Sequence, residues 1–217
     1  MPSLWRCRWP ASDELDRSAV HRTLSRWLDT DHHAQRKPWS WVADAPDLLI
    51  GLLDDRLADR LVHGADAAGT PVRQVAAASW SQLRSGRARD GWCLEFASPV
   101  TFRRGNRFLP WPSPSAVFGS LRSAWRSFGA PAVGDLELDL RLDPLVVTAV
   151  CGASRTERVT VHKQESVLVG GFVGTVRYTL DGPADRQVVD TLARLAPFSG
   201  VGAYTTRGFG GVRMLGE

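Results

Sequence analysis

Cysteine is scarce in this sequence of 217 residues. Its three cysteines, Cys7, Cys93 and Cys151, are widely spaced, odd in number and without a CxxC pair. This pattern gives no disulfide framework and no zinc site, and it fits a protein of the reducing cytosol. The N-terminus also lacks the apolar core of a signal peptide, and no apolar run reaches the roughly 18 residues of a membrane span. We therefore expect a cytoplasmic protein that does not cross a membrane.

Lysine is almost absent, although the chain is basic overall. Only Lys37 and Lys163 are lysines among 27 basic residues, and the formal net charge is +4. The planar guanidinium of arginine suits phosphate binding and base stacking, which makes RNA or DNA a plausible partner. A high-GC genome gives the same bias towards arginine, so composition alone does not decide between the two explanations.

Metal-binding patterns are missing as well. The sequence has no HxH or HExxH motif and no Asp/Glu pair with convincing ligand spacing. The acidic runs at residues 54–55 and 135–139 are more typical of solvated faces or edges. We therefore expect no metal ion and no other cofactor.

The order of the predicted elements indicates two α+β domains of similar plan. For the first, hydrophobic spacing and turn residues predict strands at residues 4–9, 39–42, 47–53 and within 71–83, and helices at 13–28, capped by Ser12 or Asp13, and at 54–62. For the second, they predict strands at residues 92–102, 136–150, 158–165, 170–180 and 212–215, a basic hairpin at 103–110, and helices at 115–128 and 184–196.

Each half then follows the order β-α-β-β-α-β of a ferredoxin-like (RRM-like) domain, so the predicted fold is a tandem of two such domains. We place the boundary in the polar stretch 84–91. This gives an N-terminal domain of residues 1–86 and a C-terminal domain of residues 87–217.

A glycine-rich segment, GVGAYTTRGFGG at residues 200–211, stands between the last predicted helix and the last strand. Val201 and Phe209 are its apolar anchors. Glycines allow positive φ, successive unpaired N–H groups can bind an anion, and Arg207 adds a charge beside them. The segment is no P-loop or dinucleotide fingerprint, because those run from strand to loop to helix.

The spacing Gly-Val-Gly, five residues, Gly-Phe-Gly resembles the glycine-rich loop of the repeat-associated (RAMP) superfamily of CRISPR proteins, and most closely its repeat-processing endoribonucleases. Two further segments resemble the same family. One is the run from Phe96 to Trp125, with FASPVTF at residues 96–102 and PWPSPSAVFGSLRSAW at 110–125. The other is GFVG at residues 171–174, which resembles the family's turn into the element that precedes the final helix.

This resemblance implies a metal-independent endoribonuclease that cleaves precursor CRISPR RNA within its repeats and leaves a 5′-hydroxyl and a 2′,3′-cyclic phosphate. The family places a catalytic histidine just after the first helix, which here indicates His33 or His32 as general acid or base, and the sequence does not decide which. Lys37, with Arg36 as a substitute, would stabilise the phosphate charge. Histidine suits this role because its unperturbed pKa is about 6.5.

The other histidines are weaker candidates. His21 is expected on the surface or flank of the first helix, and His63 at the end of the second, near its terminal carbonyls. His162 with Lys163 lies on a predicted strand and could contact RNA phosphate.

RNA binding is expected to involve basic side chains of the hairpin, the helix after it, a loop near residue 155 and the glycine-rich segment. Trp39, Trp41 and Trp111 could stack on bases. Such phosphate contacts would make affinity fall steeply with salt. The full predicted set is Arg36, Arg103, Arg104, Arg107, Arg122, Arg126, Arg155, Arg158, Lys163, Gly200, Gly202, Thr205, Thr206, Arg207, Gly208 and Gly210.

The expected partner is therefore CRISPR repeat RNA, with other subunits of an effector complex or a second copy of the chain as further partners. Two alternatives stay open. The chain could be a non-catalytic RNA-binding RAMP subunit, or a protein-interaction module whose glycine-rich segment is purely structural.

Overall fold

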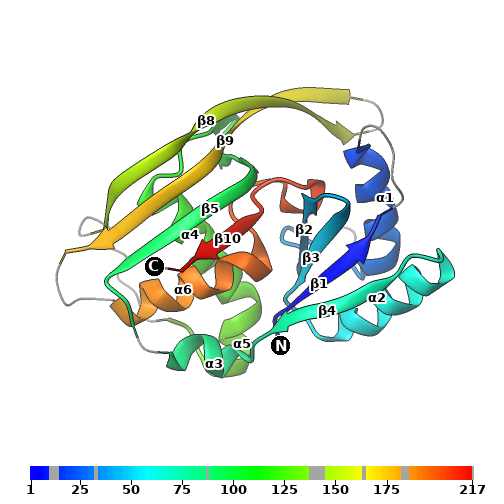
Figure 1. Cartoon of the computed structure of the whole chain (residues 1–217), viewed down its shortest axis with the longest axis horizontal. Helices are drawn as coiled ribbons and strands as arrows, with labels where there is room; N and C mark the ends of the chain where they lie inside the picture. The colour runs from blue at the N-terminus through cyan, green and yellow to red at the C-terminus, as the bar shows by residue number, and fades with distance from the viewer. Residues whose placement is uncertain are drawn as a thin grey trace.

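The computed structural model describes residues 1–9, 15–31, 34–86, 88–136, 145–162, 165–181 and 186–216, with the backbone alone for residues 158, 160–162, 165 and 166. Two four-stranded antiparallel sheets lie side by side, each with helices against one face (Figure 1). Within the described residues, no helix has the length and hydropathy needed to span a membrane.

The first sheet has the strand order β2-β3-β1-β4, and all its neighbours are antiparallel. Helices α1 and α2 pack on one face, because Val20, Leu24 and Leu28 recur every fourth residue on α1 and are buried against the strands. The elements are β1 (Ser3–Arg8), α1 (Arg17–Leu28), β2 (Trp39–Asp44), β3 (Asp47–Leu52), α2 (Arg56–Ala67) and β4 (Val72–Ala77).

The second sheet repeats this plan with the order β10-β5-β9-β8. In both sheets the first and third strands are central, and the second and fourth are at the edges, so the tandem ferredoxin-like fold predicted from element order is confirmed. The elements are β5 (Gly91–Val100), the inserted hairpin β6 (Phe102–Arg104) and β7 (Arg107–Leu109), α4 (Pro114–Ala124), β8 (Leu145–His162), β9 (Glu165–Leu180), α6 (Arg186–Ser199) and β10 (Val212–Leu215).

Two predicted helix ends of the first half were wrong. Helix α1 begins at Arg17, because the side chain of Asp16 accepts from the N–H groups of residues 18 and 19; the predicted caps at residues 12 and 13 lie outside the described residues. Helix α2 continues past His63 to Ala67, because Gly64 lies against the ring of Trp27, where a Cβ would be only 2.4 Å away. His63 is therefore inside the helix and not at its end.

Between the sheets, the strand predicted within residues 71–83 ends at Ala77 and is followed by α3 (Trp80–Ser85), which Ser79 and Gln82 cap reciprocally. After α4, the chain continues through a π-helical turn (Trp125–Gly129) and α5 (Ala130–Val133). The buried Trp80 and Leu83 of α3 join the larger core with α4 and α6. The domain boundary near residue 86 stays a prediction.

Strands β8 and β9 are longer than predicted. Residues 145–162 form one strand, so Arg155 lies on β8 and not in a loop. Residues 171–174 lie inside β9 and do not form a turn. Gly152 and Gly174 pair across the two strands, where a Cβ on Gly174 would be 2.2 Å from the carbonyl oxygen of Cys151. These glycines let the strands approach closely, and so they mark a strand interior here.

The two halves meet through α6 and the glycine-rich segment. The last turn of α6 contacts β3, where a Cβ on Gly51 would be 2.0 Å from the carbonyl oxygen of Phe198. The hydroxyl of Ser40 on β2 donates to the same carbonyl at 3.3 Å. This close approach brings the glycine-rich segment, which follows α6, against the first sheet.

Candidate nucleic-acid interface

The glycine-rich segment has a backbone that only glycine adopts easily at four positions. Gly200, Gly202, Gly208 and Gly210 have φ values of 63°, 85°, 82° and 63°. At Gly210 a Cβ would also be 1.9 Å from the carbonyl oxygen of Val201. The side chains of Val201 and Phe209 are buried, as predicted for its apolar anchors. Val201 packs into the larger core and Phe209 packs with Val159 and Val169 of the two long strands, so both side chains anchor the segment to the second half.

Tyr204 has the left-handed conformation too, with φ of 61°, and is the only non-glycine among the described residues that does. Its ring packs on Phe108 of the inserted hairpin and on Phe209, with centroid distances of 5.4 and 6.1 Å. A left-handed tyrosine costs on the order of 1 kcal/mol or more. The ring packing holds this conformation, and it directs the chain into the 3-10 turn Thr205–Arg207.

Most backbone N–H groups of the segment already donate within the protein. The N–H of Val201 donates to the carbonyl oxygen of Gly210, and that of Ala203 to Thr101, both at 2.8 Å. Across the described chain, no hydrogen bond is found for the N–H groups of residues 204–206. Unpaired N–H groups are thus confined to one part of the segment. The candidate anion site is the group of three at 204–206, where a left-handed residue precedes a helical turn.

The first half of the chain holds this turn from the other side. The carbonyl oxygen of Thr206 accepts from Trp41 Nε1 at 2.8 Å, and His21 Nδ1 lies 2.7 Å from it. Because a carbonyl only accepts, His21 carries its proton on Nδ1 in this contact. Arg17 Nη1 donates to the carbonyl oxygen of Gly208 at 2.7 Å.

The contacts of these three side chains with the turn were not predicted from the sequence, although Trp41 was named as a residue that could stack on bases. His21, expected on the helix surface, is half-buried, and its ring is stacked on Trp39 with centroids 6.0 Å apart. The available signal was the spacing of Arg17 and His21, which are one turn apart on the same face of α1. Their partners are main-chain carbonyls more than 180 residues away, which no sequence pattern marks.

Two adjoining pockets of about 270 and 290 Å³ lie beside the turn and together form what we call the basic groove. They share Arg36, Arg103, Gly202 and Ala203. The loop before β2, the inserted hairpin, the start of α4 and the glycine-rich segment all contribute. The polar lining consists of Gln35, Arg36, Lys37, Arg103, Arg104, Ser115, Ser120, Ser199, Tyr204, Thr205 and Thr206.

Arg36 and Lys37 are the residues of the predicted catalytic loop that the structure places in the groove. Arg36 Nη1 donates to the carbonyl oxygen of Ser120 on α4 at 3.2 Å. Burial lowers the pKa of Arg36, but an arginine stays protonated at neutral pH. Lys37 Nζ lies 3.4 Å from Asp29 Oδ2 and donates to the carbonyl oxygen of Asp31. These partners fix the ammonium at the edge of the groove.

His32 and His33 lie outside the described residues, as does Lys163. Of Arg158, the structure describes only the backbone, which belongs to β8. The described residues on either side of the histidines are Asp31, which accepts from Lys37, and Ala34, directly before the lining residue Gln35.

Of the other residues predicted to bind RNA, several are not in the groove. Arg126 forms an ion pair with Asp135 at 3.0 Å. Arg107 is exposed on β7, Arg155 is exposed on β8, and Arg122 lies on α4, one turn before Arg126.

Three predicted RNA-binding residues of the glycine-rich segment itself, Arg207, Gly208 and Gly210, also lie outside the lining of the groove. Gly208 packs against the first half, where a Cβ would be 2.7 Å from the ring of Trp41. Arg207 is half-buried, and burial lowers its pKa. Trp39 and Trp41 are buried, so the expectation that they stack on bases is corrected, whereas Trp111 is 53% exposed.

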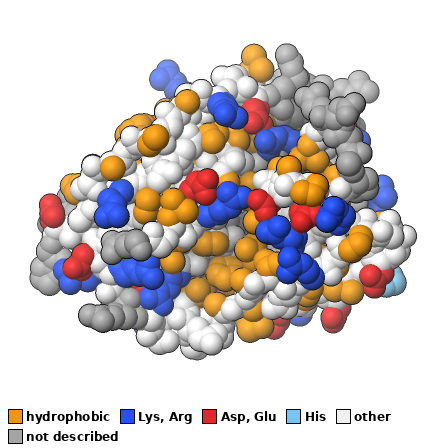
Figure 2. Space-filling view, in the orientation of Figure 1, with side chains coloured by type: hydrophobic (Ala, Val, Ile, Leu, Met, Phe, Trp, Pro, Cys, Tyr) orange, Lys and Arg blue, Asp and Glu red, His pale blue; other side chains and the backbone are white. Residues whose placement is uncertain are grey.

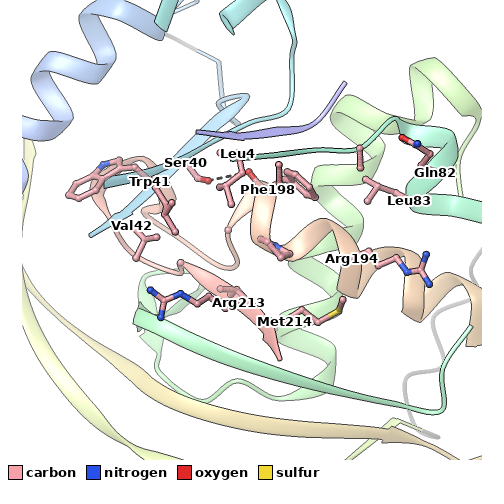
Figure 3. Close-up of a pocket in the computed structure, with 18 residues that line it drawn as sticks. Leu4, Ser40, Trp41, Val42, Gln82, Leu83, Arg194, Phe198, Arg213 and Met214 are labelled. Carbon is pink, nitrogen blue, oxygen red and sulfur yellow. Dashed lines mark hydrogen bonds between the residues drawn. The ribbon is translucent and has the colours of Figure 1, made fainter. Parts of the chain in front are cut away.

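A third pocket, of about 550 Å³, lies between the first sheet and α6 with β10, and we call it the apolar pocket. Figure 3 shows Leu4, Val42, Leu83, Phe198 and Met214 around it. In the space-filling view this region is a hollow lined with hydrophobic side chains (Figure 2). Among the described residues, no three His, Cys, Asp or Glu side chains gather as a metal site in any of these places.

Known proteins resemble this chain in both sequence and fold. A family model described as "CRISPR-associated endoribonuclease Cas6" matches residues 94–212. No curated protein sequence matches.

Three solved structures illustrate the likeness in fold. A Cas6 product complex is 23% identical, with a TM-score of 0.82 over 100% of both chains. A Thermus thermophilus Cas6 is 24% identical, with a TM-score of 0.74 over 99% of this chain and 98% of that one. A structure described as a RAMP protein binding different RNA substrates is 13% identical, with a TM-score of 0.55 over 100% of both chains.

Proposed function

Since the match extends over more than half of its length, this chain belongs to the family of the CRISPR-associated endoribonuclease Cas6, and from that premise we propose that it cleaves precursor CRISPR RNA within the repeats without a metal ion. The products are guide RNAs with a 5′-hydroxyl on one side of each cut and a 2′,3′-cyclic phosphate on the other. The partner of the basic groove is thus the repeat RNA.

The reaction is a transesterification. The 2′-oxygen of the nucleotide before the cut attacks the adjacent phosphorus, and the bond from phosphorus to the 5′-oxygen breaks. A general base takes the proton of the 2′-hydroxyl, and a general acid gives a proton to the leaving 5′-oxygen. Negative charge builds up on the phosphorane, which cations and N–H donors stabilise.

In this proposal His33 or His32 transfers the protons, and Lys37 stabilises the charge. Lys37 is held by Asp29 and by the carbonyl oxygen of Asp31, so its ammonium stands at a fixed place and is paired with one carboxylate. Arg36 is held by α4 and lines the same pocket. A phosphate that enters the pocket therefore meets two cations that need no rearrangement.

One observation carries the proposal: the basic groove combines Arg36, Lys37 and Arg103 with the N–H groups of residues 204–206 around a space of about 270 Å³. Guanidinium groups and consecutive N–H groups are both donors that suit phosphate oxygens. The adjoining pocket extends this lining towards Arg104 and the start of α4. RNA that follows the groove would thus have basic groups for more than one phosphate.

The test is incubation of the purified protein with 5′-labelled repeat RNA in EDTA. We expect one cut, with an upstream product that ends in a cyclic phosphate and a downstream product whose 5′ end polynucleotide kinase labels without prior dephosphorylation. The double variant His32→Ala and His33→Ala should lose the cut and keep RNA binding. His63→Ala is the matched control, because His63 is exposed on α2 and lies outside the groove.

Each other outcome assigns a different role. RNA retardation without any cut would indicate a non-catalytic RNA-binding RAMP subunit. Cleavage that EDTA abolishes would contradict the metal-independent reaction. If the protein shows no salt-dependent RNA binding, the result would favour a protein-interaction module.

A further inference from the structure

Trp111 is the one Phe, Trp or Tyr side chain that is exposed in the part of the chain that the structure describes. It is 53% exposed, and Leu109, two residues earlier, is 39% exposed as well. A tryptophan ring carries a large apolar surface, which in a folded protein is usually covered by the core or by a binding partner. The core does not cover this one, so we looked for what else could.

The backbone around Trp111 is fixed by contacts that do not need its ring. Its carbonyl oxygen accepts from the N–H of Ser113 at 3.0 Å. The next residue, Pro112, is buried, and its carbonyl oxygen accepts from the hydroxyl of Tyr178 at 2.7 Å. The ring contacts Phe172 edge-to-face, with centroids 6.3 Å apart. The loop therefore presents the ring at a fixed place, and most of the ring stays in solvent.

The loop that carries Trp111 joins two elements that both line the basic groove. Before the loop, the hairpin β6–β7 contributes Phe102 and Arg104, and Phe102 pairs with Leu109. After the loop, α4 contributes Ser115. Two residues span at most about 7 Å, so the backbone of Trp111 is close to Leu109 and to the hairpin end of the groove.

We propose that Trp111 is a stacking platform for an unpaired base of the RNA whose phosphates lie in the basic groove; this assignment rests on the proposed function. Unpaired bases stack on aromatic side chains, and a base inside a duplex cannot, because its neighbours cover both of its faces. Arg103 and Arg104 are exposed on the hairpin and line the groove, so the phosphate beside the stacked base has cations within reach. Since every base has a flat π face, the contact selects an unpaired nucleotide more than a particular base.

The surroundings of the ring favour RNA over a protein partner. A tryptophan at the centre of a protein interface is generally enclosed by other packed side chains. The groove beside Trp111 is lined instead by arginines and serines of the hairpin and of α4, which are Arg103, Arg104, Ser115 and Ser120. An apolar ring next to a basic groove is the combination that single-stranded nucleic acid requires.

The test compares Trp111 variants in binding to labelled repeat RNA, by fluorescence anisotropy in EDTA. All are made with His32→Ala and His33→Ala, so that the RNA stays intact. Trp111→Ala should weaken binding about tenfold, and Trp111→Leu nearly as much, because leucine is apolar but has no π face. Trp111→Phe should lose only about threefold. The slope of log affinity against log salt should not change, since no phosphate contact is removed.

The matched control is Leu168→Ala, because Leu168 is 65% exposed on β9 and lies outside the lining of the groove. This variant should bind the RNA like its parent. A set of repeat RNAs that each lack one base then identifies the stacked nucleotide. For one of these RNAs Trp111→Ala should cost less than twofold, because the partner of the ring has already been removed, and for the others it should cost the full tenfold.

Parent-like binding of Trp111→Ala overturns the proposal and would favour a protein partner for the ring. Equal losses with every RNA of the set overturn it as well, and so does a changed salt slope. RNA binding by the native chain without a cut contradicts the proposed cleavage alone and leaves this test valid. A native chain that does not bind the repeat RNA overturns both proposals.

Discussion

The basic groove and the apolar pocket both border the glycine-rich segment, and Gly200 lines both. The apolar pocket also contains arginines, but these are paired with acids: Arg194 lies 2.7 Å from Asp190, and Arg213 lies 2.6 Å from Asp44. Both sites therefore contain arginines, and they differ in whether a carboxylate neutralises the charge of those arginines.

In the basic groove, Arg36 and Arg103 donate to the main-chain carbonyls of Ser120 and Gly105, and no carboxylate pairs with either among the described residues. A carbonyl satisfies the N–H group and leaves the positive charge uncompensated. An anion is thus attracted to the basic groove and not to the apolar pocket. Charge balance separates the two pockets better than volume does.

The largest effect is expected from a substitution in the glycine-rich segment, which borders both pockets. Gly210→Ala should lower the free energy of unfolding by about 3 kcal/mol or more, because the new Cβ would be 1.9 Å from the carbonyl oxygen of Val201 at a φ of 63°. Urea denaturation measures this loss. RNA affinity should fall with it, since the wall of the groove moves.

Gly105→Ala is its control. Gly105 has a similar φ of 58°, but nothing lies within 4 Å of the added Cβ. This variant should cost only about 1 kcal/mol. Equal losses in the two variants would contradict the close packing inside the segment.

Removal of the uncompensated charges is the next largest change. Arg36→Ala with Arg103→Ala should weaken RNA binding about a hundredfold at moderate salt and reduce the slope of log affinity against log salt by about two. Fluorescence anisotropy with labelled repeat RNA over a series of KCl concentrations measures both. Arg126→Ala should have a much smaller effect, because Asp135 pairs with Arg126. A similar loss in all variants would mean that general charge, and not the groove, binds the RNA.

A change in the apolar pocket should separate stability from RNA binding. Leu83 is 3% exposed and lines this pocket. Leu83→Ala should lower the free energy of unfolding by about 2 kcal/mol and leave RNA affinity unchanged within about twofold. Denaturation and anisotropy on the same sample give both values. A tenfold loss of affinity would show that the two pockets act as one site.

The smallest effect is expected from a substitution of Trp41, the side chain that connects the two pockets. Trp41 lines the apolar pocket, and its Nε1 donates to the carbonyl oxygen of Thr206 at the groove. Trp41→Phe keeps a buried ring and removes this hydrogen bond, which should cost about 1 kcal/mol of stability. RNA affinity should fall only a few-fold, because His21 still contacts the same carbonyl. An unchanged affinity would mean that the turn holds its shape without Trp41.

Much of the fold follows from local sequence signals, because hydrophobic spacing and turn residues give the order of strands and helices in both halves. The length of β8 does not follow from them. Its residues 148–156 are exposed on both faces and show no alternation, so the sequence looks like a loop between two strands. Helix α3 was missed because its apolar residues, Trp80 and Leu83, continue the pattern expected of the preceding strand.

For the site, the motifs identified the glycine-rich segment and the loop with Arg36 and Lys37, and the structure brings these two far-apart stretches to one pocket. The contacts that hold the segment in place were not predicted. Arg17, His21 and Trp41 act on main-chain carbonyls, and a carbonyl is present at every residue, so nothing in the sequence distinguishes the ones that are used.

Arg17 stands in the first helix of the chain, and its guanidinium contacts the carbonyl oxygen of Gly208, the rings of Trp41 and Phe209, and Glu157 of β8. Its partners on the second half, among them Glu157 and Gly208, are made by the ribosome much later than Arg17 itself. During synthesis the first sheet can fold early, since domains generally form as units from the N-terminus. The groove, by contrast, is completed only after residues 199–206 have been made, so it forms later than the first sheet.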